Sequence, residues 1–203
     1  MIADATPRVD ADNRAGTGAC PYGRMKIEIT HPWGKPLSHI LIEGRRLYML
    51  DFTEKRIYRG SLKSKRFSQH IPVPLNHSIL WSLARAFPAL LKHRETASIA
   101  GNQFTLMDET GDKVQHFELY SAEPLPRRVC FCEQNTTIVF SDFQDDDGIL
   151  YARQMRFHGS HNIGMEIGID QMNFNTPLPK AVFSMETPPD FKTVHLEDED
   201  QEH

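Results

Sequence analysis

The first clear pattern along the chain is an alternation of apolar and polar residues that begins at Arg24. Met25, Ile27 and Ile29 alternate with charged or polar residues as far as Thr30. This pattern is typical of a strand with one buried and one solvent-facing side. The following segment, HPWGK, contains proline and glycine and predicts a turn. Further strands, separated by short turns, are expected at residues 37–43, 47–52 and 56–60.

A single segment has helical rather than strand periodicity. Its apolar residues recur on one side at helical spacing: Ile79, Leu80, Leu83, Phe87, Leu90 and Leu91. Asn76 or Ser78 can cap its start by accepting backbone N–H bonds, and Pro88 should end or kink it. The pattern therefore predicts a helix from about 76 to 91, with the face formed by Leu80, Leu83 and Phe87 packed on a sheet.

The second half of the chain returns to strand patterns. After a polar stretch at 93–101, alternation predicts strands around 104–106 and at 114–120, 128–133, 136–143, 149–157 and 163–170. Short strands at regular spacing indicate a meander. The predicted fold is mainly β, a curved antiparallel half-open β-barrel with one or two helices packed on the concave face. We expect a flexible arm over 1–23, one domain over 24–196 and an acidic tail over 197–203.

Composition supports a folded domain and disfavours some partners. The 203 residues are 39% hydrophobic and 25% charged, with a net charge of −4. Such a chain can bury a core, and it lacks the general basic field expected for nucleic-acid binding. Basic residues do cluster between Lys55 and Arg66. A solvated strand edge and an anionic partner explain them equally well.

The beginning of the chain has no apolar stretch of the kind found in secretory signals. Cys20 follows Thr17-Gly18-Ala19, and a small residue before cysteine is typical of a lipoprotein cleavage site. The apolar segment that such a site needs is missing from this sequence.

Candidate chemistry is sparse. Cys130 and Cys132 lie two apart in a predicted strand and without ligands at zinc-site spacing, which favours two small apolar side chains on one face. The aspartates before Gly148 lack the spacing of a calcium loop and favour a turn. The histidines are scattered, and no HExxH, GxSxG, Walker or Rossmann motif occurs. We therefore predict no catalytic residues, no metal site and no cofactor.

The apolar residues of the predicted strands and helix instead predict the lining of an apolar ligand-binding cavity. The expected lining residues are Ile27, Ile29, Leu41, Leu80, Leu83, Phe87, Phe131, Phe140, Met155 and Met165. Methionine adapts to ligands of variable shape, although it is also an ordinary core residue. Alternation decides which residues of a strand share a face, but not which face is concave.

Three stretches together resemble the LolA/LolB superfamily, and LolB-like outer-membrane lipoprotein receptors in particular. The first is residues 24–34, a strand that runs into a proline–hydrophobic–glycine turn. The second is the IPVPLN segment at 71–76, followed by Leu80-Trp81-Ser82-Leu83 and Pro88. The third comprises Phe140-Ser141-Asp142-Phe143 with Asp147-Gly148, then residues 172–175, Phe183 and Pro188-Pro189.

The resemblance implies an apolar cavity that binds lipoprotein acyl chains or related lipid, without catalysis, for transport to or insertion in the outer membrane. It places the protein in the bacterial cell envelope, either in the periplasm or on the periplasmic face of the outer membrane, although this sequence shows no signal peptide. Two alternatives remain open. One is an enzyme that uses the same cavity for a small hydrophobic substrate, with a histidine and a carboxylate as acid and base. The other is a structural accessory protein of the envelope.

Trp33 carries the most specific hypothesis. It lies in the turn between two amphipathic strands, where alternation cannot place it in the core. It can fold back over the barrel mouth, or it can stand exposed, since indole prefers the membrane–water interface. The matching turn of LolB-like receptors resembles this one and presents an apolar residue to the membrane. The resemblance thus implies that Trp33 is a membrane-contacting tip. The oligomeric state is not predicted.

Overall fold

The computed structural model describes residues 2–3, 24–62, 64, 77–159, 164–174 and 176–196. The chain divides into two compact units, which we call unit 1 (Met1–His70 with Asn173–His203) and unit 2 (Ile71–Met172). Unit 2 is thus inserted in sequence between the two parts of unit 1. Apart from Ile2 and Ala3, the predicted flexible arm lies outside the described residues, and so does the acidic tail.

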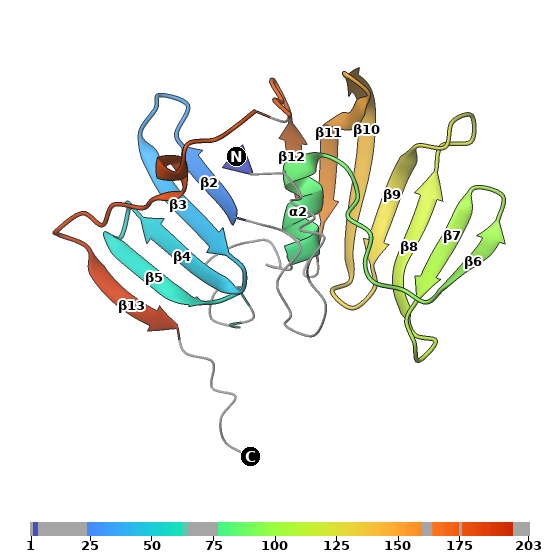
Figure 1. The fold of residues 1–203 in the computed structure, drawn as a ribbon, viewed down its shortest axis with the longest axis horizontal. Helices are drawn as coiled ribbons and strands as arrows, with labels where there is room; N and C mark the ends of the chain where they lie inside the picture. Colours follow the sequence, from blue (N-terminus) through green and yellow to red (C-terminus); the bar gives the residue numbers. More distant parts are fainter. Residues whose placement is uncertain are drawn as a thin grey trace, which may run out of the picture. The chain divides into compact units, whose positions relative to one another are not determined.

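Unit 1 contains a six-stranded sheet in the order β1-β2-β3-β4-β5-β13. Its strands are β1 (Ile2–Ala3), β2 (Arg24–Thr30), β3 (Pro36–Glu43), β4 (Arg46–Asp51), β5 (Arg56–Ser61) and β13 (Lys192–Leu196). The strands from β1 to β5 pair antiparallel with their neighbours, whereas β13 pairs parallel with β5. Figure 1 shows β13 at the edge of this sheet, beside β5.

The segment before β13 crosses one face of the sheet in unit 1. A parallel neighbour needs such a crossover, because the chain must return to the same end of the sheet. The 3₁₀ helix η2 (Lys180–Phe183) contacts β2, where the Arg24 guanidinium carbon lies 4.7 Å from the centre of the buried Phe183 ring. Farther along, Phe191 packs edge-on against Phe52 at 5.5 Å between ring centroids. The crossover therefore packs one buried and one partly exposed aromatic side chain against unit 1.

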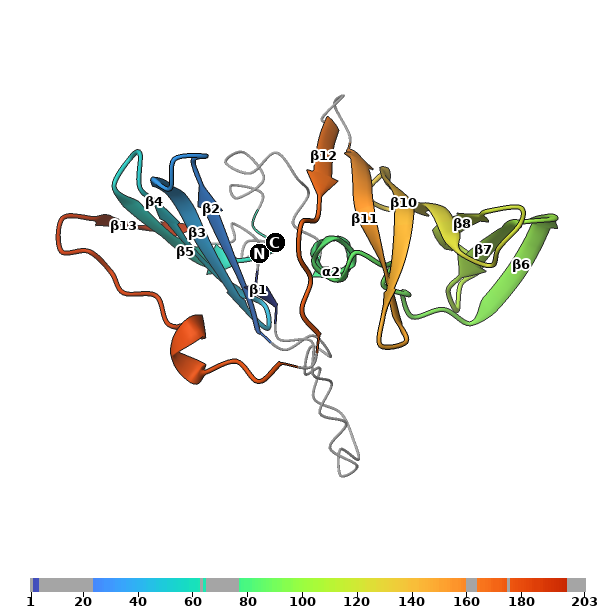
Figure 2. The same cartoon turned by 90° about the horizontal axis from the view of Figure 1, so that it is seen from above.

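Unit 2 contains a seven-stranded antiparallel sheet in the order β12-β11-β10-β9-β8-β7-β6. Its strands are β6 (Glu95–Ala100), β7 (Gln103–Met107), β8 (Lys113–Leu119), β9 (Pro126–Phe131), β10 (Thr136–Asp146), β11 (Ile149–His158) and β12 (Gly164–Gly168). Every strand pairs with its neighbour in sequence, as the predicted meander requires. Figure 2 shows the succession of strands from β12 to β6.

The helix α2 (His77–Arg85) is shorter than the predicted 76–91. Ala86 adopts a left-handed conformation with φ 53°, and the N–H of Phe87 donates to the carbonyl of Ser82 at 3.2 Å. This arrangement ends the helix at Arg85, three residues before Pro88, as a helix-ending motif does. The carbonyl of Ala86 then accepts a hydrogen bond from the Ala152 N–H at 2.8 Å, which fastens the end of α2 to β11.

The mainly β architecture, with antiparallel open sheets and a helix, is confirmed. The number of sheets and two of the strands differ from the prediction. The strands divide between two sheets instead of one, because the meander is interrupted after β5. The polar stretch at 93–101 contains the strand β6, and β13 was not predicted at all. Both are edge strands, whose pairing with one neighbour does not require an apolar pattern.

Candidate functional site

The residues predicted to form one apolar lining are divided between the two units. Ile27, Ile29 and Leu41 belong to unit 1, whereas the predicted residues from Leu80 to Met165 belong to unit 2. Each group is therefore described within its own unit.

In unit 1, cross-strand pairing separates Leu41 from the two isoleucines. Ile27 pairs with Ile40, whereas Leu41 pairs with Lys26 and Tyr48. Paired residues point to the same face and successive residues to opposite faces. The expectation that Ile27, Ile29 and Leu41 share one lining is therefore wrong for Leu41, which is buried on the opposite face.

The face that carries Ile27 and Ile29 changes from buried to exposed along β2. Met25 is fully buried, Ile27 is half-buried and the Ile29 side chain is 44% exposed. On the opposite face, Lys26 and Glu28 form an ion pair of 2.8 Å. The hydrogen bond from Lys26 lowers the pKa of Glu28. β2 is thus amphipathic, and its apolar side becomes accessible towards the turn.

The turn after β2 presents Trp33. The indole is 79% exposed, which agrees with the second of the two placements considered from sequence. Two backbone hydrogen bonds close the turn: the N–H of His31 donates to the Lys35 carbonyl at 2.8 Å, and the N–H of Gly34 donates to the His31 carbonyl at 2.7 Å. Gly34 has φ 82°, a conformation that favours glycine. The His31 ring lies 3.7 Å from the indole, between centroids. Trp33 is therefore an exposed side chain on an ordered turn.

In unit 2, the predicted strand residues do share one face. Phe140 pairs with Met155, and Met165 pairs with Phe157 on the next strand pair. Phe131 and Phe140 are 0% exposed and Met155 is 1% exposed, while Met165 is half-buried. The first three pack inside the core of unit 2, and a role in ligand binding stays a prediction for all four.

The helix residues pack in the same unit. Leu80 and Leu83 are buried on α2, whereas Phe87 lies beyond the end of the helix and is half-buried. Gln115, 0% exposed, holds the chain after the helix: its side-chain oxygen accepts the N–H of Leu91 at 2.7 Å and its amide donates to the Ala89 carbonyl at 2.9 Å. The segment 89–91 is thus fixed to β8 by a buried glutamine that sequence reasoning missed.

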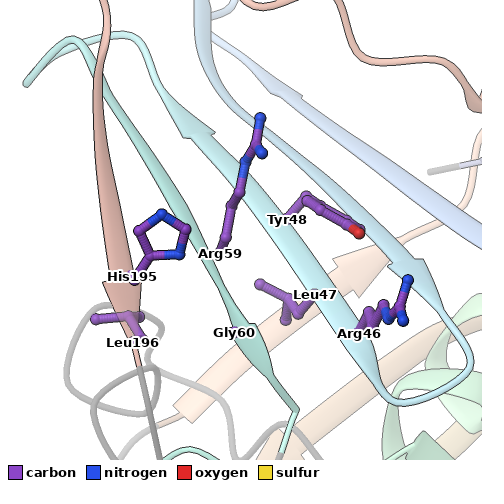
Figure 3. A pocket seen from close by; sticks show the side chains of 7 residues that line it. All are labelled: Arg46, Leu47, Tyr48, Arg59, Gly60, His195 and Leu196. Atoms are coloured by element: carbon purple, nitrogen blue, oxygen red, sulfur yellow. The ribbon is translucent and has the colours of Figure 1, made fainter.

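Unit 1 also has a surface depression that the sequence pattern did not predict. A depression with a volume of about 450 Å³ is lined by Arg46, Leu47, Tyr48, Arg59, Gly60, His195 and Leu196. Figure 3 shows these residues on three neighbouring strands, β4, β5 and β13. Of the polar members, only Arg59 belongs to the basic cluster noted in the sequence. The sequence alone could not place His195 in this depression, because only the parallel pairing of β13 with β5 brings it beside Arg59.

Other candidate chemistry is limited in the described part of the chain. Within these residues, no group of three His, Cys, Asp or Glu side chains is placed to hold a metal ion. Cys130 and Cys132 are half-buried free thiols, and burial is the main cause of the raised pKa of Cys132. A raised thiol pKa disfavours the nucleophilic thiolate. No described helix has the length and apolar character needed to cross a bilayer.

Comparisons with known proteins give structural matches only. No family model matches the sequence, and no curated protein matches it. Among solved structures, the chain is similar to a domain described as an outer membrane lipoprotein-sorting protein from Vibrio parahaemolyticus, with 15% identity and a TM-score of 0.46 over 76% of this chain and 72% of that one.

Two further solved structures match over similar lengths. A DUF1329 family protein from Desulfovibrio piger has 16% identity and a TM-score of 0.47, covering 73% of this chain and 69% of its own. A LolA superfamily protein from Nitrosomonas europaea has 14% identity and a TM-score of 0.45, covering 80% and 78%.

Proposed function

We propose that this protein binds acyl chains of lipoproteins, or related lipid, without catalysis, and that the β2–β3 hairpin contacts a membrane surface. One observation carries the proposal: Trp33, 79% exposed, stands on a turn that two backbone hydrogen bonds hold in place. The order of the motifs in the sequence, which resembles that of LolB-like receptors, supports the same role.

The physical case for membrane contact begins with the indole. Tryptophan is enriched at membrane–water interfaces, where its ring is partly buried in lipid and its N–H meets polar headgroups. The turn needs no rearrangement to present Trp33, so little conformational entropy is lost when it binds. Ile29, 44% exposed on the strand that leads to the turn, adds apolar surface close to the tip.

The path for an acyl chain would follow the same face of β2. Ile29 and the half-buried Ile27 lie on one side of the strand, with the buried Met25 beyond them. Each methylene removed from water contributes about 0.8 kcal/mol, so a chain needs a continuous apolar surface more than any reactive group. By this proposal the protein acts in the bacterial cell envelope, and the outer membrane is the surface that it meets.

The test follows the fluorescence of Trp33 in a Trp81→Phe background, since the chain has two tryptophans. Vesicles of phosphatidylcholine, with and without phosphatidylglycerol, are titrated into the protein. We expect a blue shift of the emission and protection from an aqueous quencher. Trp33→Ser should weaken vesicle binding measured by co-sedimentation, whereas Trp81→Phe should leave it unchanged.

A separate measurement addresses the lipid ligand. Binding of a fluorescent fatty acid should weaken in Ile29→Ser and stay unchanged in Glu28→Gln, a change to the neighbouring residue on the opposite face. Mass spectrometry of lipid extracted from purified protein should detect fatty acid or phospholipid. A Trp33 emission that vesicles do not alter would overturn membrane contact, and equal probe binding by all variants would overturn the acyl path.

A further inference from the structure

The polar residues that line the depression in unit 1 lie on one face of the sheet. Tyr48 on β4 pairs with Arg59 on β5, and Arg59 pairs with His195 on β13, so these three form a row across three strands. Arg46 lies two residues before Tyr48 on β4 and shares its face. From this arrangement we infer that the depression binds a phosphate group.

The floor of the depression is formed by the backbone of three paired residues, one on each of these strands. Leu47, Gly60 and Leu196 pair across the same three strands, and both leucine side chains are buried on the other face of the sheet. Their backbone, with no side chain at Gly60, borders the depression, and Figure 3 shows the Tyr48 side chain between those of Arg46 and Arg59. A volume of about 450 Å³ can hold a phosphate together with a small attached group.

The charge of this surface is not compensated within the described residues. Arg46 and Arg59 form no ion pair with a described carboxylate, and Glu43, the cross-strand partner of Arg46, does not reach ion-pair distance. Several other basic side chains of the protein do have a carboxylate within 2.7 to 3.6 Å, among them those of Lys26, Lys55, Arg56, Lys92, Arg127, Arg128 and Arg156. Two guanidinium groups on one face, neither of them paired with a described carboxylate, attract an anion.

The donor chemistry suits phosphate better than a lone carboxylate. Guanidinium groups donate in a planar fork that matches phosphate oxygens, and imidazole and phenol groups add further donors. Arg59 is pre-oriented, because its guanidinium carbon lies 5.9 Å from the centre of the Tyr48 ring. The depression is open to solvent, so a ligand held by its phosphate can keep the rest of its body outside.

Titrations of the full chain test the site with three probes: inorganic phosphate, glycerol 3-phosphate and vesicles that contain phosphatidylglycerol, each followed by NMR of the His195 ring and the arginine Nε–H groups. The variant R46Q/R59Q should weaken binding at least about tenfold, as expected when charged hydrogen bonds are lost. The matched control R94Q/R156Q removes two exposed arginine charges from unit 2 and should bind as the natural sequence does. Circular dichroism and thermal melting check that both variants stay folded.

The three probes distinguish a soluble phosphorylated ligand from a lipid headgroup. Binding of the soluble probes supports a free phosphorylated ligand, and binding of the vesicles alone supports a lipid headgroup. The vesicle arm is repeated with Trp33→Ser, so that loss of hairpin contact is not mistaken for loss of the phosphate site. The inference is overturned if no probe perturbs His195 and the arginines, or if R46Q/R59Q and R94Q/R156Q bind equally.

Discussion

The two units of this protein build their sheets in different ways. Unit 2 is one continuous segment, Ile71–Met172, in which each strand pairs with its neighbour along the chain. Unit 1 is assembled from two segments, and its last strand, β13, reaches β5 from the other end of the sequence. The ion pair of 2.7 Å between Lys55 and Asp190 joins residues 135 positions apart.

This difference in construction accompanies a difference in surface. In unit 2 the predicted apolar face is filled by Phe131, Phe140 and Met155. Unit 1 instead exposes Trp33 at a turn and carries a depression whose two arginines pair with no described carboxylate. The apolar residues most visible in the sequence thus form the core, whereas the features suited to binding lie at a turn and where strands distant in sequence pair.

The largest expected effect is on the core of unit 2. Phe140→Ala should destabilise it by about 3–5 kcal/mol, because a buried aromatic ring is replaced by a cavity. Denaturation followed by Trp81 fluorescence in a Trp33→Phe background measures this. Val139→Ala, half-buried on the same strand, is the control and should cost about 1 kcal/mol or less. Phe140→Ala is also followed by Trp33 fluorescence in a separate Trp81→Phe background. If Trp33 in unit 1 reports the same shift as Trp81, the two units unfold as one cooperative unit.

The next effect concerns the closing strand of unit 1. Leu196 is buried on β13, so Leu196→Ala should cost about 2–5 kcal/mol. Trp33 fluorescence in the Trp81→Phe background should report the loss. Thr193→Ala, exposed on the same strand, should change the midpoint little. Equal midpoints for the two variants would contradict a structural role for the parallel pairing.

A smaller effect is expected at Gln115 in unit 2. Gln115→Leu keeps the size of the side chain but leaves the Leu91 N–H and the Ala89 carbonyl without their partner. Unmade hydrogen bonds of this kind cost about 1–3 kcal/mol. Hydrogen exchange at Leu91 should become faster, while Gln103→Leu on β7 leaves that amide protected. Unchanged exchange in Gln115→Leu would show that other contacts hold the segment 89–91.

The smallest effect is expected from the exposed ion pair between Lys55, just before β5, and Asp190, just before β13. The hydrogen bond from Lys55 is the main cause that lowers the pKa of Asp190 below its ordinary value of 3.8. Because the pKa is lower in the folded state, the pair stabilises unit 1 above pH 3.8 and the contribution is lost as the pH falls through the lowered value. Asp190→Asn should therefore lower the Trp33 midpoint slightly at pH 7, and the difference from the natural sequence should shrink as the pH falls below 3.8. Glu109→Gln, from the exposed pair with Lys92 in unit 2, is the control and should leave the Trp33 midpoint unchanged.

Much of the local structure was determined by the sequence alone. Alternation placed β2 at Arg24–Thr30, helical spacing located α2, and the HPWGK segment indicated the turn that presents Trp33. These features depend on periodicity and on the backbone preferences of proline and glycine, which act within a few residues. The shared face of Phe140 and Met155 follows from the same rule applied to adjacent strands.

How the strands combine into sheets could not be predicted from the sequence. The tertiary structure placed Leu41 on the face opposite Ile27, ended α2 at Arg85 through the left-handed Ala86, and paired β6 and β13 as edge strands. It also brought His195 beside Arg59. The physical reason is that alternation orders the side chains of one strand, whereas register, neighbour and direction depend on backbone hydrogen bonds between segments far apart in the chain.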